Sequence, residues 1–221
     1  MVRKLNISLY QPKKDSCDIC LQYELKNLTE DVWISHRDSK ERARAEKSND
    51  KTASKNGVCH TITMELQAVK VCPAVNASSA YYKTKLCCTC YWFNKAEADL
   101  QASVFASCLI EYIKRHLTDS KPVIIYSDGC SYQNKNSVMA NALLHLSSEL
   151  KITIEQKYLV KGHTQMECDS VHALIERKIK NQSIYLPSDY FRLCQESRKT
   201  SPYETITLDH SFFKDFKKNV L

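Results

Sequence analysis

Five residues able to bind a metal or move a proton lie close together in "KGHTQMECDSVHALIERKIK", residues 161–180. They are His163, Glu167, Asp169, His172 and Glu176. In a helix that begins near Met166, Asp169, His172 and Glu176 would share one face, because residues three and four apart are neighbours on a helix. Four aliphatic residues would lie on the other face and pack on a core: Val171, Leu174, Ile175 and Ile179. The polar face is either a solvated surface or one side of a metal site.

A second acid, Asp128, ends the short apolar run "VIIYSD" and is followed by the amide-rich "QNKN". Ligands in open α/β sheets bind at the carboxyl ends of strands, which makes Asp128 a candidate ligand with Asn134 and Asn136 in support. The alternative is an aspartate that caps the following turn or helix, a frequent use of this residue type.

Glu65 is a third acid, inside the otherwise strand-like "TITMELQAVKVC". Glutamate is disfavoured in a strand unless it faces solvent or has a partner. Acids from a first strand, a central strand and a late helix are the arrangement by which a ribonuclease H-like core holds two divalent metals. Mg²⁺ or Mn²⁺ held by Glu65, Asp128 and Asp169 would activate an attacking oxygen in phosphodiester chemistry, with His172 as a further ligand or proton donor. For His172, a structural hydrogen bond to a neighbouring acid stays an equal alternative.

The N-terminal segment contains a Cys-x-x-Cys pair, Cys17 and Cys20, which is half of a zinc site. His36 is a candidate third ligand, and Cys59 or His60 a candidate fourth. Two reduced structural cysteines are the alternative. The chain has 11 cysteines, an odd number, so a complete set of intrachain disulfides is impossible. The run containing Cys87, Cys88 and Cys90 looks like a strand with small buried side chains.

The elements that must position these residues alternate in type. Strands are predicted at 61–72, 81–93, 123–128 and 152–160, and helices at 98–117, 137–150 and from 166 onward. This order indicates an α/β domain with a mixed sheet flanked by helices. Upstream, residues 30–48 read as a charged helix and "KSNDKTASKNG" as a solvated linker.

Three regions follow from this order. Residues 1–57 would form a Cys-containing segment with a basic helix and linker, residues 58–190 the core, and residues 191–221 a C-terminal segment packed on the core. The net charge of +7 favours a polyanionic partner, most simply DNA. No apolar run reaches the roughly 20 residues of a membrane helix and no signal peptide is evident, so we expect an intracellular, and by function nuclear, protein without membrane contact.

Several motifs carry a resemblance to a known family. They are "MELQAVKVCP", "YYKTKL", "YSDGCSYQNKNSVMANALLH", "QKYLVKGHTQMECDSVHALIERKIKN" and "IYLPSDY". Together they resemble a transposon-derived domain of insects and other animals, generally regarded as having a ribonuclease H-like transposase or integrase core. The resemblance runs from about Asn6 to Phe216. It implies a DNA-cutting and strand-joining ancestor with acidic ligands at Glu65, Asp128 and Asp169, supported by His163, His172 and Glu167.

Departures from that pattern bear on catalysis. Aspartate is expected where Glu65 stands, and the very short segment between Phe93 and Ala98 predicts a missing or shortened strand beside the first ligand. Relatives are also usually longer upstream. The leading hypothesis is therefore a transposase-derived nucleic-acid-binding protein whose catalysis has decayed or been repurposed. One alternative is an active Mg²⁺- or Mn²⁺-dependent nuclease and strand transferase, and another is a non-catalytic interaction module. Dimerisation is compatible with all three.

Overall fold

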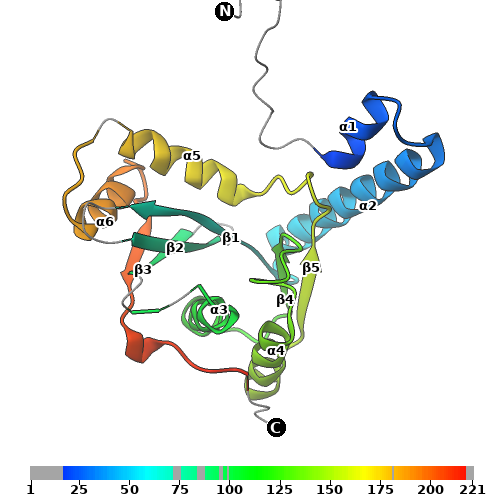
Figure 1. Ribbon diagram of the computed structural model, residues 1–221. Helices are drawn as coiled ribbons and strands as arrows, with labels where there is room; N and C mark the ends of the chain where they lie inside the picture. Colours follow the sequence, from blue (N-terminus) through cyan, green and yellow to red (C-terminus); the bar gives the residue numbers. More distant parts are fainter. Residues whose placement is uncertain are drawn as a thin grey trace, which may run out of the picture.

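The computed structural model describes residues 17–71, 76–83, 88–94, 97–98, 100–180 and 182–217. In these residues six strands form one mixed sheet in the order β5-β4-β1-β2-β3-β6 (Figure 1). The strands are β1 His60–Val71, β2 Asn76–Lys83, β3 Cys88–Asn94, β4 Val123–Ser127, β5 Ile154–Tyr158 and β6 Glu204–Thr207. The pairs β1–β4, β4–β5 and β3–β6 are parallel, and β1–β2 and β2–β3 are antiparallel. The predicted α/β class is confirmed, with β1, β4 and β5 forming a three-stranded parallel part.

Helices cover both faces of the sheet. They are α1 Asp18–Glu24, α2 Glu30–Lys55, α3 Ala102–His116, α4 Ser137–Leu150, α5 Glu167–Ile179 and α6 Pro187–Glu196. Alternate residues of β4 separate the two faces: Ile125 packs in the main core with α3 and α4, whereas Tyr126 packs with α2 and α5 residues. None of the helices described is long and apolar enough to cross a membrane.

The predicted single strand over 81–93 is wrong, and the third strand that was expected to be missing or shortened is β3, which ends at Asn94. This region is divided between β2 and β3, and β2 begins at Asn76, well before the predicted start. The start of β2, "NASSA", is rich in small polar residues that rarely signal a strand. Pairing with β1 on one side and β3 on the other holds it in the sheet despite that composition.

The predicted linker at 47–57 is also wrong, because α2 continues as a helix to Lys55. Its last turns pack on the sheet. Asp50 accepts hydrogen bonds from the Tyr126 hydroxyl at 2.6 Å and from Lys157 Nζ at 2.7 Å, and Ala53 packs against the cluster that contains Tyr126. These contacts outweigh the weak helix propensity of the serines, asparagine and threonine in this stretch.

The C-terminal region contributes to the sheet as well as packing on it. α6 runs across the boundary expected at residue 190, and β6 then pairs with β3. Cys90 is fully buried against α5 and α6, as expected from sequence, whereas Cys87 lies outside the described residues. The eight cysteines whose side chains the structure describes are free thiols: Cys17, Cys20, Cys59, Cys90, Cys108, Cys130, Cys168 and Cys194.

Candidate functional site

A cleft of about 670 Å³ lies between the first two helices and the face of the sheet that α5 covers. Four segments supply its lining: residues 17–19, His36 of α2, Glu65 of β1, and the stretch from Val160 to Asp169 that follows β5. Two groups of side chains that could hold a metal ion border this cleft. One contains Cys17, Cys20, His36 and His163, and the other Glu65, Asp169 and His172.

The cysteine–histidine group is compact. His36 Nε2 lies 3.2 Å from Cys17 Sγ and 3.1 Å from His163 Nε2, and His163 Nε2 lies 3.4 Å from Cys20 Sγ. All four ligand atoms are within 4.8 Å of one another. Tetrahedral zinc bonds of about 2.3 Å to sulfur and 2.0–2.1 Å to nitrogen separate sulfur from nitrogen by about 3.6 Å, and two nitrogens by about 3.3 Å. The four residues therefore could bind zinc with small adjustments.

Gly162 lets the loop after β5 approach Cys17 closely. Its φ is +77°, a conformation that other residues rarely adopt. A Cβ at this position would lie 2.8 Å from both the Cα and the Cβ of Cys17. The absence of a side chain thus allows the next residue, His163, to reach the two cysteines.

The surroundings of His163 favour its neutral form, which is the form that binds a metal. Burial lowers its pKa, and the nearby charges of Lys40, His36 and Arg44 lower it further. Its imidazole is therefore neutral at physiological pH, as metal binding requires. Burial, together with the neighbouring Cys17, raises the pKa of Cys20, so a metal must displace a proton from this thiol.

The fourth member of the cysteine–histidine group differs from the predicted zinc ligands. Cys17, Cys20 and His36 come together as expected, but Cys59 and His60 lie elsewhere. Cys59 Sγ faces the Asp50 carbonyl oxygen at 3.9 Å, and His60 Nε2 is 2.5 Å from Asp119 Oδ1. His163, predicted to support the acidic site, takes the fourth place. It lies 143 residues beyond Cys20, so sequence spacing could not reveal the pairing.

The acidic group brings together three of the four predicted catalytic residues. His172 Nδ1 lies 3.7 Å from Glu65 Oε2, and the three ligand atoms of Glu65, Asp169 and His172 are all within 4.8 Å of one another. Glu65 faces α5 because Met64, its neighbour in β1, points into the opposite core. Asp169 is fixed at the start of α5, where its Oδ2 accepts a hydrogen bond from the Met166 backbone N–H at 2.7 Å. Asp169 offers one carboxylate oxygen to the acidic group.

Asp128 is not a member of this group. Its Oδ1 accepts a hydrogen bond from Asn134 Nδ2 at 2.5 Å and a longer one from the Cys130 backbone N–H at 3.4 Å. Asn134 is buried, and its carbonyl oxygen accepts hydrogen bonds from Gln156 and Tyr158 of β5. Asn134 therefore holds the loop after β4 against the neighbouring strand.

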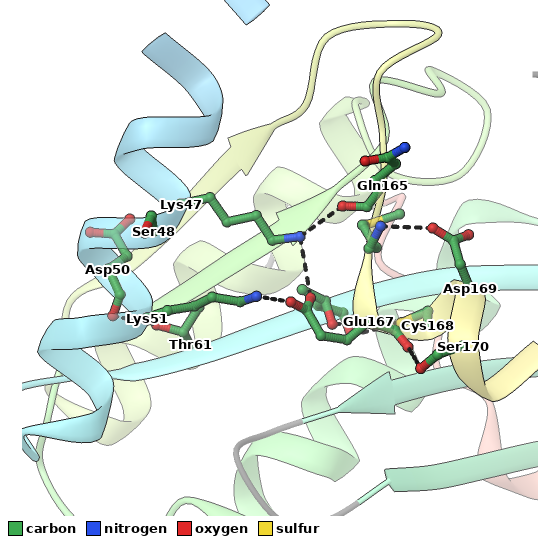
Figure 2. A network of polar contacts seen from close by, with 12 residues as sticks. Lys47, Ser48, Asp50, Lys51, Thr61, Gln165, Glu167, Cys168, Asp169 and Ser170 are labelled. Carbon is green, nitrogen blue, oxygen red and sulfur yellow. Dashed lines mark hydrogen bonds and ion pairs between the residues drawn. The ribbon is translucent and has the colours of Figure 1, made fainter. Parts of the chain in front are cut away.

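The remaining predicted residues have structural contacts. Asn136 is the N-cap of α4, and its Oδ1 accepts a hydrogen bond from the Met139 backbone N–H at 2.9 Å. Glu167 lies between Lys47 and Lys51 of α2 (Figure 2). Lys47 Nζ also donates to the Gln165 carbonyl oxygen at 3.2 Å, which joins α2 to the loop before α5. The roles of Gly162 and Lys47 were not predicted from the sequence. Only Gly162 offered a signal, as a glycine directly before a candidate ligand.

Comparison with known proteins places part of the chain in a family. No curated protein matches it. A family model described as a domain of unknown function (DUF8701) matches residues 67–208, more than half of the chain. The matched segment includes Asp128, His163, Asp169 and His172, whereas Cys17, Cys20, His36 and Glu65 precede it. The chain belongs to this family of domains of unknown function.

Proposed function

We propose that the chain is a transposase-derived nucleic-acid-binding protein with a ribonuclease H-like core, and that the cleft is its binding site. The observation that carries this proposal is the meeting of Glu65, from the first strand, with Asp169, from a late helix, on one face of a mixed sheet. Such a core also needs an acid from a central strand. Asp128, which follows β4, is the candidate for that position.

The register of the sheet supports Asp128 in this role. The last residues paired between β1 and β4 are Thr63 and Tyr126. Two residues further along each strand, and so on the same face, are Glu65 and Asp128. Neighbouring strands are about 4.8 Å apart, so rotation of the Asp128 side chain away from Asn134 would bring its carboxylate towards the acidic group.

The donor set suits a hard divalent cation. Carboxylate oxygens are the ligands that Mg²⁺ and Mn²⁺ prefer, and an imidazole nitrogen is tolerated beside them. Glu65, Asp169 and His172 would hold such an ion. When bound, it would supply charge stabilisation for a phosphate group of the nucleic acid.

Cations near the cleft support a polyanionic ligand. Lys161 lines it and is 94% exposed, and Arg44 and Lys40 are close enough to His163 to lower its pKa. These charges, with the net +7 of the chain, would attract a phosphate backbone.

A fluorescence anisotropy titration with labelled duplex and single-stranded DNA tests this proposal. Removing two cations in or near the cleft, with Arg44→Gln and Lys161→Gln together, should make the slope of log K against log salt shallower by about 2. The matched control is Arg198→Gln with Lys199→Gln, which removes one arginine and one lysine from the α6–β6 connection. An absence of DNA binding by the folded chain at low salt, or an equal loss in both double variants, would contradict the proposal.

A second candidate function, metal-dependent DNA cleavage and strand transfer, is favoured by β3. The expected loss or shortening of a strand was the main argument against catalysis, whereas β1, which carries Glu65, pairs with β2, and β2 in turn pairs with β3. Incubation of DNA with the protein and Mn²⁺ should then give cleavage that Glu65→Gln abolishes. Binding of DNA without cleavage would contradict this second function and would leave nucleic-acid binding as the proposed function.

A further inference from the structure

The first part of the described chain has few apolar contacts that could hold it in place. This arm, defined as residues 17–45, contains α1 and the first half of α2 and projects beyond the sheet (Figure 1). α1 has no buried residue, and Leu21 and Leu25 are 46% and 61% exposed. The stacked rings of Tyr23 and Trp33 join α1 to α2 within the arm and do not attach it to the core.

The buried residues of the arm are instead of types that can bind a metal. Cys17 and His36 are 8% and 9% exposed, and both belong to the cysteine–histidine group. Burying polar groups of this kind without strong partners is costly, and their association with each other and with His163 is the main feature that joins the arm to the loop after β5. A further contact there, the ion pair of Lys161 with Asp18 at 3.6 Å, is highly exposed and contributes little.

We propose that one zinc ion bound by Cys17, Cys20, His36 and His163 is a structural clamp that fastens the arm to the loop preceding α5. Four protein ligands complete the tetrahedral coordination of zinc and leave no open position for a substrate, which is the property of a structural site. Three ligands come from the arm and one from the core, so the ion closes a loop of more than a hundred residues. The clamp depends only on these four side chains and is independent of nucleic-acid binding or catalysis.

The geometry gives the clamp a consequence for the cleft. Cys17 and His36 line the cleft on one side, and the same loop that carries His163 continues through Thr164 and Gln165 into α5, which carries Asp169. Zinc would therefore fix one wall of the cleft and the start of the helix that supplies an acidic ligand.

Metal analysis of the full chain tests the ligand set. The protein, expressed with zinc in the medium, should contain about one zinc ion per chain, and Cys20→Ser and His163→Gln should reduce this to about none. Cys59→Ser and His60→Gln are the matched controls, because they remove a cysteine and a histidine that lie outside the group, and they should retain the metal. A folded zinc-free wild-type chain would overturn the proposal, as would loss of zinc in His60→Gln with retention in His163→Gln.

Hydrogen exchange of the wild-type chain tests the clamp without relying on any variant. Chelation of zinc should accelerate amide exchange in α1 and the first half of α2, leave β4 and α3 unchanged, and be reversed by adding zinc back. Unchanged protection of the arm after complete zinc removal would show that the ion is not a clamp.

Discussion

At the scale of single residues, the cysteine–histidine group depends on a position with no side chain. Gly162 combines a positive φ with a Cβ position 2.8 Å from the backbone and side chain of Cys17. Gly162→Ala should therefore strain the loop and displace His163, which lowers the free energy of unfolding by about 1–3 kcal/mol and weakens zinc binding by about 10–100-fold. Competition with a chromophoric chelator measures the affinity.

Gly129→Ala is the control for this substitution. A Cβ at Gly129 would meet no atom within 4 Å, and its φ is not positive. This variant should keep both the stability and the zinc affinity of the wild type. Equal zinc affinities in the two alanine variants would contradict the role given to Gly162.

Most members of the two groups were predictable from the sequence, but which residues lie together in each group was less so. Local spacing identified Cys17, Cys20 and His36, and helix periodicity correctly placed Asp169 and His172 on one face. The assignment of His163 to the acidic site was wrong because its true neighbours are distant in the chain. The path of the loop after β5, which Gly162 allows, determines that His163 joins the cysteine–histidine group and not the acidic group.

At the scale of elements, α2 is attached to the sheet by a polar network near its C-terminal end. The Asp50 carboxylate accepts hydrogen bonds from Tyr126 and Lys157, and the side chains of Asp50 and Lys157 are only 17% and 15% exposed. Asp50→Ala would leave Lys157 without this partner in a largely buried position. We expect a loss of about 2–4 kcal/mol in the free energy of unfolding, measured by denaturant titration.

Asp38→Ala tests whether this loss is specific to the network. Asp38 lies on the same helix, its side chain is 62% exposed, and its ion pair with Arg37 spans 3.9 Å. Its removal should change stability by no more than about 0.5 kcal/mol. Similar losses in the two variants would indicate a general effect on the helix and not the docking of α2.

Element types were predictable where periodicity was strong and were missed where tertiary contacts decide. The helix predicted at 137–150 matches α4, and the strand predicted at 123–128 matches β4 to within one residue. The end of α2 and the start of β2 have sequences typical of loops. Their structures are stabilised by contacts with Tyr126 and with two neighbouring strands, which local composition does not report.

At the scale of the whole molecule, the cleft unites two groups of different chemistry. Soft thiolates and imidazoles on one side suit zinc, whereas the oxygen-rich group on the other side suits Mg²⁺ or Mn²⁺. Their meeting requires the arm, β1, the loop after β5 and α5 to converge. The sequence indicated each group separately, but the shared cleft arises from the topology of the sheet and could not be predicted from spacing.

Two helices of the chain provide a matched pair of acids for testing the acidic group. Asp169 and Asp189 both occupy the third position of a helix, and each accepts a hydrogen bond from the backbone N–H of its N-cap residue. Asp169 lines the cleft and Asp189 does not. Substitution by asparagine removes one charge at either position with a similar effect on helix capping.

The most direct test of the account is a calorimetric titration of Mn²⁺ into the zinc-loaded chain and these two variants. We expect the wild type and Asp189→Asn to bind Mn²⁺ alike, and Asp169→Asn to bind at least about tenfold more weakly, because it loses a charged oxygen ligand. An absence of Mn²⁺ binding by the folded wild type, or equal affinity in all three proteins, would contradict a divalent cation site in the cleft.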